Sequence, residues 1–566
     1  MIRLIPQVKR LDMLDGVLQV KSVCCDGVAC DERVLAALEK LPQDADGATV
    51  SVTVMGDAGE GYELWIGERD IRIEAASDAG AFYAVQTLRQ IFASEEIPCV
   101  HIVDEPDFAY RGFYQDITRG RVHTLETLKE LIDRLAYYKY NSLQLYVEHT
   151  FECEEYADVI GQLGYITDEE LHELDAYCRQ HFIDFIPSLA TFGHLYDLLH
   201  QEKYRHLCVL RDQQDGINFW NGRHAHHTID PLVDGSVETV RHLIDQYAPH
   251  FTSEYFNICC DETFDLKQCA QKAGLDTAQL YIDFVKQIIA HVTSKGKKTM
   301  MWADVLLENP EVIDEMPEDT CFLNWDYGAE PKEEKIAKLA HAKQIVCPGT
   351  STWWRLCEKP TVSQSNIAKM AEYGKKYGAI GLLNTNWGNY GNMATIDLAM
   401  FGLAVGAEKA WSVDTPIDDA FYDCVNHLVY DNENGMAMLM ELSALQDMVN
   451  WQQFCTDSFE FIYNPTPRLN DCKTVVRDVQ EKYKAFAEKL AAQSWTRDAY
   501  REDMLIAAEG ICLTAELAAL MRGATVERVT DTAAWLDKFR QQWLKTTKES
   551  ELFRIENMMM GIQNKL

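Results

Sequence analysis

The feature that most constrains the fold is an alternation of short apolar runs and longer amphipathic stretches between residues 108 and 425. Eight short runs have the length and composition of buried strands, and the stretches between them, such as 125–138 and 277–294, have helical apolar spacing. Eight strand–helix alternations match an α/β fold, the (β/α)8 or TIM barrel. A doubly wound open sheet is the alternative, but no glycine-rich phosphate loop follows the first run. The predicted strands are 112–116, 142–147, 184–189, 254–260, 299–302, 321–325, 344–347 and 380–384.

The segments on either side of this region have different patterns. Residues 1–107 contain alternating apolar and polar runs and one helical stretch, which predicts a small N-terminal α+β domain. Residues 426–566 lack the barrel pattern and contain helical patterns at 437–449, 472–492, 503–522 and 532–547, which predicts a C-terminal helical domain packed on the barrel or on a second copy of the chain. The sequence therefore predicts three domains, 1–107, 108–425 and 426–566, and allows a homo-oligomer through the C-terminal helices.

Charge and cysteine content limit the partners and the compartment. The formal net charge of −36 argues against nucleic acid or an anionic membrane as the main partner. The first ten residues lack the apolar core of a signal peptide, and we expect no stretch long and apolar enough to span a bilayer. The 17 cysteines are scattered without a C-x-x-C pair, so neither a zinc site nor a disulfide framework is indicated. These observations favour a cytoplasmic protein.

The segment 254–260 ends abruptly in two adjacent acids, Asp261 and Glu262. Successive side chains of a strand point to opposite faces, so both acids share one pocket only if the strand has ended and the backbone has turned. That is the geometry at the carboxyl end of a barrel strand, where barrel enzymes carry their catalytic groups. Taken alone, the pair would be read as a solvated acidic loop, but the ends of the other strands change this interpretation.

The residues that follow the other predicted strands share a chemical character. They are tryptophans, acids, an arginine and histidines, and together they are typical of an aromatic-walled pocket for a sugar ring. Aromatic faces stack on the C–H groups of a pyranose, while carboxylates and arginine bind its hydroxyls. In chain order they are Arg119, Glu148 with His149, His194, Trp302 with Asp304, Trp325 with Asp326 and Tyr327, Trp353 with Trp354, and Trp387 with Asn389.

A cluster of three histidines, His224, His226 and His227, is the one candidate metal site in the sequence. No acid or cysteine accompanies it at ligand spacing, so we predict no metal. A solvated loop, or a rim that touches a second sugar, is the favoured interpretation.

Over roughly residues 49 to 390 the chain resembles glycoside hydrolase family 20, the β-N-acetylhexosaminidases. Segments 80–88 and 98–112 are similar to the family's small N-terminal domain and its joint to the barrel. The Asp-Glu pair is the most specific feature. The motifs that carry the resemblance are Asp116-Ile117-Thr118-Arg119, Lys139-Tyr140-Asn141, Phe192-Gly193-His194, Thr228-Ile229-Asp230-Pro231 and Asp261-Glu262.

The chain also departs from the family pattern. Cys259 and Cys260 stand where the family often has a glycine-rich run. Asn389 stands where the family commonly has a glutamate that reads the sugar's 4- and 6-hydroxyls. The family's seventh-strand tyrosine has no clear match, and Tyr327 is the substitute candidate. Either Glu148 or His149 takes the place of the second-strand acid.

The resemblance implies an exo-acting, retaining hydrolase that releases terminal β-linked N-acetylhexosamine through an oxazolinium intermediate without a cofactor. It implies that Glu262 is the acid and later the base, that Asp261 orients the acetamide, and that Arg119 holds ring hydroxyls. Two carboxyls in one apolar pocket are driven to different pKa values, which suits these roles. The expected partner is a small oligosaccharide or glycoconjugate. The predicted substrate-binding residues are Arg119, His194, Glu148, Trp302, Trp325, Tyr327, Trp353, Trp387 and Asn389.

Two alternatives stay open from the sequence. The first is another substrate-assisted enzyme, similar to O-linked N-acetylglucosamine hydrolases. A resemblance to that class would place paired aspartates at the centre of the site, whereas this chain has Asp-Glu. The second is a non-catalytic sugar-binding barrel, although binding alone needs no general acid. Turnover of a chromogenic N-acetylglucosaminide separates an enzyme from a binder.

Overall fold

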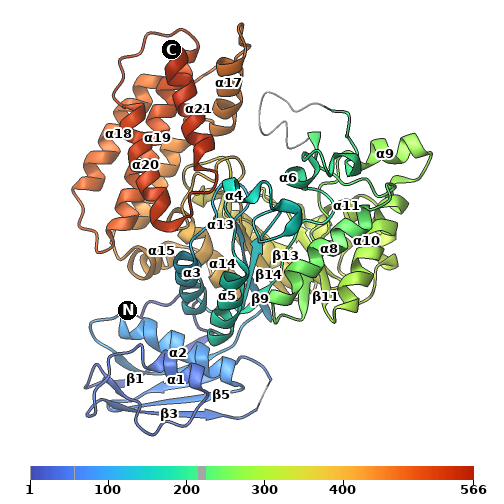
Figure 1. Cartoon of the computed structure of the whole chain (residues 1–566). Coiled ribbons are helices and arrows are strands. Elements are labelled where there is room, and N and C mark those ends of the chain that lie inside the picture. The colour runs from blue at the N-terminus through green and yellow to red at the C-terminus, as the bar shows by residue number, and fades with distance from the viewer. Residues whose placement is uncertain (1, 57, 214–224) are drawn as a thin grey trace.

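A parallel barrel stands at the centre of this computed structural model, which describes residues 2–56, 58–213 and 225–566 (Figure 1). Within those residues, eight strands pair in parallel in the order β10-β11-β12-β13-β14-β7-β8-β9, and a bridge between Ser188 and Asn257 joins β9 to β10. All eight predicted strands are confirmed, with β9 and β10 shorter than predicted. They are β7 (Tyr110–Asp116), β8 (Ser142–Tyr146), β9 (Asp184–Ile186), β10 (Tyr255–Asn257), β11 (Lys298–Trp302), β12 (Cys321–Trp325), β13 (Gln344–Cys347) and β14 (Gly381–Asn386).

Helices follow the strands and cover the outside of the barrel. α3 (Leu125–Tyr137) shows why: the Thr124 side chain caps its first turn, and its apolar face, which includes Leu128 and Leu131, is buried. This arrangement leaves the carboxyl ends of the strands free to carry loops. The other helices are α4 (Ile160–Leu163), α5 (Asp168–Gln180), α6 (Tyr196–Leu199), α8 (Ser236–Tyr247), α9 (Leu266–Ala273), α10 (Thr277–Ser294), α11 (Asp304–Glu308), α12 (Glu333–Lys338), α13 (Pro360–Lys376) and α14 (Met400–Trp411).

The N-terminal part is a six-stranded mixed sheet with two helices, in the order β1-β6-β4-β5-β3-β2. A buried ion pair fastens it to the barrel, because Lys139 Nζ lies 3.0 Å from Asp104 Oδ2. The indole N–H of Trp411 donates to the other oxygen of Asp104 (2.9 Å). The elements are β1 (Arg10–Val17), β2 (Val23–Cys24), α1 (Glu32–Leu38), β3 (Ala48–Val54), β4 (Tyr62–Ile66), β5 (Asp70–Ala75), α2 (Asp78–Phe92) and β6 (Pro98–Asp104).

The C-terminal part is a group of helices that lies against one side of the barrel (Figure 1). One of them, α19, is long and apolar enough to cross a membrane by length and composition, so the expectation that no such stretch exists is wrong. In the structure 78% of its most apolar window is buried, as in the core helix of a bundle. The helices are α15 (Asp419–Val425), α16 (Gly435–Gln446), α17 (Trp451–Tyr463), α18 (Val476–Ala491), α19 (Asp498–Met521), α20 (Thr532–Thr546) and α21 (Leu552–Lys565).

Candidate active site

The two adjacent acids lie on a tight turn just past β10. The strand ends at Asn257, and Cys259, Cys260 and Glu262 all have left-handed backbone conformations (φ +57°, +64° and +52°). Such conformations cost non-glycine residues about 1–3 kcal/mol each and cluster at functional sites. The turn brings Asp261 and Glu262 to the same side of the backbone, as predicted. Glycine adopts a left-handed conformation without strain, which explains why a glycine-rich run is often found in the family at the positions of Cys259 and Cys260.

Surrounding groups hold this strained turn. The Tyr281 hydroxyl donates to Cys260 O (2.8 Å), and the Thr191 hydroxyl donates to Ile258 O (2.6 Å). The backbone N–H of Glu262 donates to Asp304 Oδ2 (3.0 Å), so the carboxylate after β11 fixes the position of Glu262. The turn is therefore supported from three neighbouring elements of the barrel.

His194, after β9, lies between the two acids and the end of β8. Its Nε2 is 3.3 Å from both Asp261 Oδ2 and Glu262 Oε2, and its Nδ1 is 3.7 Å from Glu148 Oε1. Gly193 allows this approach, because a Cβ there would lie 2.5 Å from Asp261 O. The four polar side chains form one chain of contacts from Glu148 through His194 to the acids.

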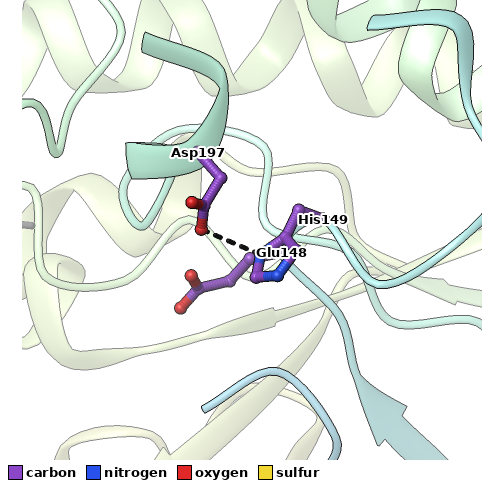
Figure 2. A group of neighbouring side chains, drawn as sticks. All are labelled: Glu148, His149 and Asp197. Carbon is purple, nitrogen blue, oxygen red and sulfur yellow. Dashed lines mark ion pairs between the residues drawn. The ribbon is translucent and has the colours of Figure 1, made fainter. Parts of the chain in front are cut away.

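Glu148, rather than His149, is the residue after β8 that faces this chain of contacts. Glu148 accepts a hydrogen bond from the Tyr146 hydroxyl (2.8 Å) and lies 3.7 Å from the guanidinium of Arg119. His149 points to α6 instead, where its Nδ1 lies 3.0 Å from Asp197 Oδ2 (Figure 2). The structure thus distinguishes two residues that the sequence left as alternatives.

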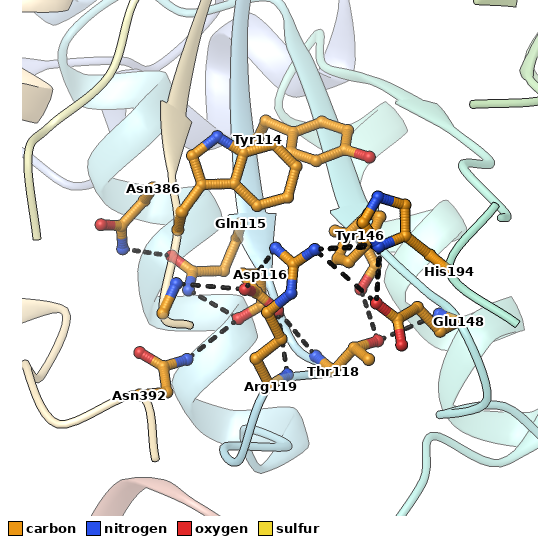
Figure 3. Close-up of polar contacts among 12 residues, drawn as sticks. Tyr114, Gln115, Asp116, Thr118, Arg119, Tyr146, Glu148, His194, Asn386 and Asn392 are labelled. Atoms are coloured by element: carbon orange, nitrogen blue, oxygen red, sulfur yellow. Dashed lines mark hydrogen bonds and ion pairs between the residues drawn. The ribbon is translucent and has the colours of Figure 1, made fainter. Parts of the chain in front are cut away.

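Arg119 is held at the base of the site by the end of β7 (Figure 3). Asp116, fully buried, accepts the backbone N–H groups of Thr118 (2.9 Å), Arg119 (3.1 Å) and Gly388 (3.0 Å), so it joins the loops after β7 and β14. The Arg119 guanidinium lies over the Tyr146 ring at 4.7 Å. The contacts at its backbone N–H and over the plane of its guanidinium therefore hold Arg119 in one place at the cavity.

A cavity of about 230 Å³ opens between these groups and an aromatic wall. Trp325 and Tyr327 stack at 5.1 Å between ring centroids, and the indole N–H of Trp387 donates to the Tyr327 hydroxyl (2.7 Å). Every predicted site residue except Glu148 lines the cavity, and Glu148 lies directly behind His194. The lining residues are Arg119, His194, His227, Asp261, Glu262, Trp302, Trp325, Tyr327, Trp353, Trp387 and Asn389.

His227 also lines the cavity, although the sequence left it either in a solvated loop or at a rim that touches a second sugar. His226 and His227 are both buried, so the solvated loop is wrong for these two, while His224 lies outside the described residues. The His227 ring packs against that of His194 (centroids 4.4 Å apart). The loop that carries it folds back over the site, a contact that local sequence does not signal.

Two groups in the described part of the chain have the donor atoms for a metal ion: Glu148 with His149 and Asp197, and His194 with Asp261 and Glu262. In the first group, His149 is already paired with Asp197. In the second, the same three atoms make an acid–base arrangement that needs no ion. The geometry therefore adds no argument for a cofactor.

His194 and Asp304, which both lie beside the two adjacent acids, have shifted pKa values. Burial by itself would lower the pKa of His194, but the charge of Asp261 and the close carboxylate oxygens of Asp261 and Glu262 outweigh it and raise the pKa to about 9. Burial, together with the charge of Asp261, raises the pKa of Asp304 to about 7. At neutral pH, His194 is thus an imidazolium that balances a cluster of carboxyl groups.

This shift predicts a pH dependence of stability. A histidine with a raised pKa stabilises the folded state fully below its ordinary pKa of about 6.5, and this contribution is lost as the pH rises through about 9. We expect His194→Asn, which tolerates the left-handed φ of +60°, to lower the melting temperature more at pH 6 than at pH 10. A melting-temperature difference that is the same at both pH values would contradict the charged state of His194.

Family models match most of the chain. The model described as glycosyl hydrolase family 20, catalytic domain, matches residues 108–412, and the model of the same family's domain 2 matches residues 1–105. The first covers the whole barrel and every residue of the cavity. Together they leave the C-terminal helices unmatched.

Curated relatives and solved structures agree with these matches. A β-hexosaminidase of Vibrio furnissii is 23% identical over 382 residues, which are 57% of this chain and 59% of that protein. A β-hexosaminidase of Porphyromonas gingivalis is 27% identical over 284 residues, 44% of this chain and 36% of that protein. The chain thus spans less than two thirds of either relative. The structure of a chitobiase of Flavobacterium johnsoniae shares the fold with a TM-score of 0.59 at 16% identity, over 99% of both chains.

Proposed function

The chain belongs to glycosyl hydrolase family 20, and from this premise we propose that it is an exo-acting, retaining β-N-acetylhexosaminidase. One observation carries the proposal: Asp261 and Glu262 lie side by side, both 3.3 Å from His194 Nε2, in a cavity of about 230 Å³ walled by aromatic rings. The substrate is a terminal N-acetylglucosamine or N-acetylgalactosamine on a small oligosaccharide or glycoconjugate.

In the first step the bond between the anomeric carbon and the leaving oxygen breaks. Glu262, about a third exposed and so accessible to the leaving group, gives its proton to that oxygen. The acetamido carbonyl oxygen of the same sugar bonds to the anomeric carbon from the opposite face and forms an oxazolinium ion. Asp261, more buried, accepts the acetamide N–H and stabilises the positive charge that develops there.

In the second step a water molecule attacks the anomeric carbon and opens the oxazolinium ring. The Glu262 carboxylate takes a proton from this water, so it ends the cycle protonated again. Two inversions leave the product in the β configuration. His194, charged at neutral pH, balances the carboxylate of Asp261 throughout.

The shape of the site supports release of one sugar at a time. The cavity has room for a single ring, and Trp353 also lines an adjoining groove of about 570 Å³ between the loop after β13 and the C-terminal helices. This groove gives the leaving part of the substrate a place outside the pocket. Asn389 carries no charge and both donates and accepts hydrogen bonds, so we include both 4-epimers of the sugar in the proposal.

Digestion of a chitin tetrasaccharide tests the proposal. We expect single N-acetylglucosamine units and the trisaccharide as the first products, because the pocket has room for one ring at the chain end. Early disaccharide formation without the monosaccharide would contradict exo-action. Absence of any hydrolysis, with binding retained, would instead indicate a sugar-binding barrel.

The compartment and the oligomeric state are further proposals. All 17 cysteines are free, which supports a reducing compartment such as the cytoplasm; disulfides in protein purified from its own cell would contradict this. Leu544 on α20 and Phe553 and Met560 on α21 are exposed, which supports a homo-oligomer through these helices. Sedimentation as a monomer at micromolar concentration would contradict that contact.

A further inference from the structure

The loop after β7, residues 117–124, carries Arg119 of the sugar cavity and pairs with residues 546–551, near the end of the chain. This second segment connects α20 to α21, so the pairing joins the barrel to the C-terminal helical domain. The backbone hydrogen bonds are Thr124 N–H to Thr546 O (3.1 Å), Lys548 N–H to Val122 O (2.8 Å) and Glu551 N–H to Gly120 O (3.2 Å).

Arg121, in the middle of this loop, is 1% exposed. Its Nε donates to Asn392 O (2.6 Å), in the loop after β14 that also carries Trp387 and Asn389. Its guanidinium carbon lies 4.1 Å from the ring centroid of Trp543 in α20. One side chain therefore fastens both sugar-binding loops to the C-terminal domain through a stacked ring and a charge-assisted hydrogen bond.

The two loops cross next to Arg121 at a pair of glycines. A Cβ on Gly120 would lie 2.9 Å from the Gly391 backbone, and a Cβ on Gly391 would lie 2.6 Å from Ile555 Cδ1 in α21. Asn389 and Asn392 are left-handed (φ +50° and +42°) on either side of this crossing. A loop with two such residues keeps its conformation only when its surroundings determine it.

From these contacts we propose that Arg121 is a positioning residue of the sugar site, through which the C-terminal domain holds Arg119 and Asn389 in their binding geometry. Arg119 is two residues before Arg121, and Asn389 three residues before Asn392. The proposal rests on the proposed function, since Arg119 and Asn389 are taken to bind the hydroxyls of the terminal sugar. The helical domain then completes the sugar site from outside the family's barrel model.

The test replaces Arg121 with methionine, which keeps most of the volume and removes the hydrogen bonds and the charge. Arg119 and Asn389 bind the sugar before and during reaction alike, so we expect KM for an aryl β-N-acetylglucosaminide to rise about tenfold or more with kcat nearly unchanged. The pH profile of kcat should also be unchanged, because the acids and His194 are not touched. Arg121→Lys, which keeps the charge without the planar fork, should lie between wild type and Arg121→Met.

Arg134→Met is the matched control. Arg134 is a largely buried arginine of α3 that pairs with Asp397 and does not line the sugar cavity. We expect it to lose a similar amount of thermal stability and to keep the wild-type KM. If Arg121→Met also keeps the wild-type KM while its melting temperature falls, Arg121 is merely structural and the proposal is wrong.

A double-variant cycle tests whether Arg121 acts through its contact with Trp543 in the C-terminal domain. We expect Trp543→Leu to raise KM as well, and the double variant with Arg121→Met to be no worse than the worse single variant. If the KM increases of the two single variants multiply in the double variant, the two residues act separately, and the proposed action through the C-terminal domain is wrong. Calorimetric binding of N-acetylglucosamine to the same variants measures the effect without turnover, so a wild-type protein that binds the sugar but does not hydrolyse substrates would refute the proposed function alone.

Discussion

Replacing Glu262 with glutamine is expected to lower the turnover of the β-1,4-linked N-acetylglucosamine disaccharide by about 10²–10⁴-fold, the usual range for a general acid–base group. The leaving sugar hydroxyl is a poor leaving group, so the step needs a proton from Glu262. The amide keeps the shape of the side chain and the backbone N–H bond to Asp304 (3.0 Å), but it has no proton to give. The loss should therefore appear in kcat with the structure of the site intact.

Substrates with acidic leaving groups make this prediction specific. A nitrophenyl or dinitrophenyl N-acetylglucosaminide needs little protonation, so Glu262→Gln should slow its first step much less than it slows the disaccharide. Glu254→Gln is the matched control, because Glu254 is an exposed carboxylate at the start of the same segment, paired with Lys298. Wild-type rates of Glu262→Gln on the disaccharide would show that another group is the acid.

Replacing Asp261 with asparagine is expected to lower turnover by about 10²–10³-fold, the scale of losing one preorganised electrostatic group. The acetamide becomes positively charged as its oxygen attacks, and a neutral amide in place of the Asp261 carboxylate cannot balance that charge. The rates of the Asp261 and Glu262 variants should therefore depend differently on the leaving group. Acidic leaving groups should not rescue Asp261→Asn, because Asp261 acts on the nucleophile and not on the leaving oxygen.

Measurement of both variants on the disaccharide and on a nitrophenyl glycoside tests this difference. The expected result is rescue of Glu262→Gln and no rescue of Asp261→Asn. Equal rescue of both variants by the nitrophenyl leaving group would mean that the two carboxyls share the protonation step. In that case the division of roles proposed for the pair is wrong.

The barrel could be predicted from the sequence because its strands are buried on both faces. A run such as 321–325 or 344–347 is short, apolar and followed by a helical pattern, so its type does not depend on a distant partner. The site residues could be predicted for the same reason. The carboxyl ends of parallel strands meet at one mouth, so Arg119, Asp261 and Trp387 come together once the strands are placed in order.

What the sequence did not reveal depends on contacts between distant segments. β1 (Arg10–Val17) is mostly exposed, and pairing with β6 makes it a strand, since it has no clear apolar alternation. His227 enters the cavity because its loop folds back onto His194. Arg121 contacts a tryptophan more than 400 residues away, and no local pattern predicts this. The helices α17 and α21 were likewise not predicted.

In the proposed mechanism the substrate's own acetamide is the nucleophile. In the described site, Asp261 and Glu262 are assigned the other catalytic roles. Asp304 accepts the backbone N–H of Glu262, so we do not assign it as a nucleophile. The most direct measurement compares kcat/KM for nitrophenyl β-N-acetylglucosaminide and nitrophenyl β-glucoside, which differ only at the 2-position. The proposal predicts hydrolysis of the first and essentially none of the second. Comparable rates on both would contradict substrate assistance and would require a nucleophile supplied by the protein.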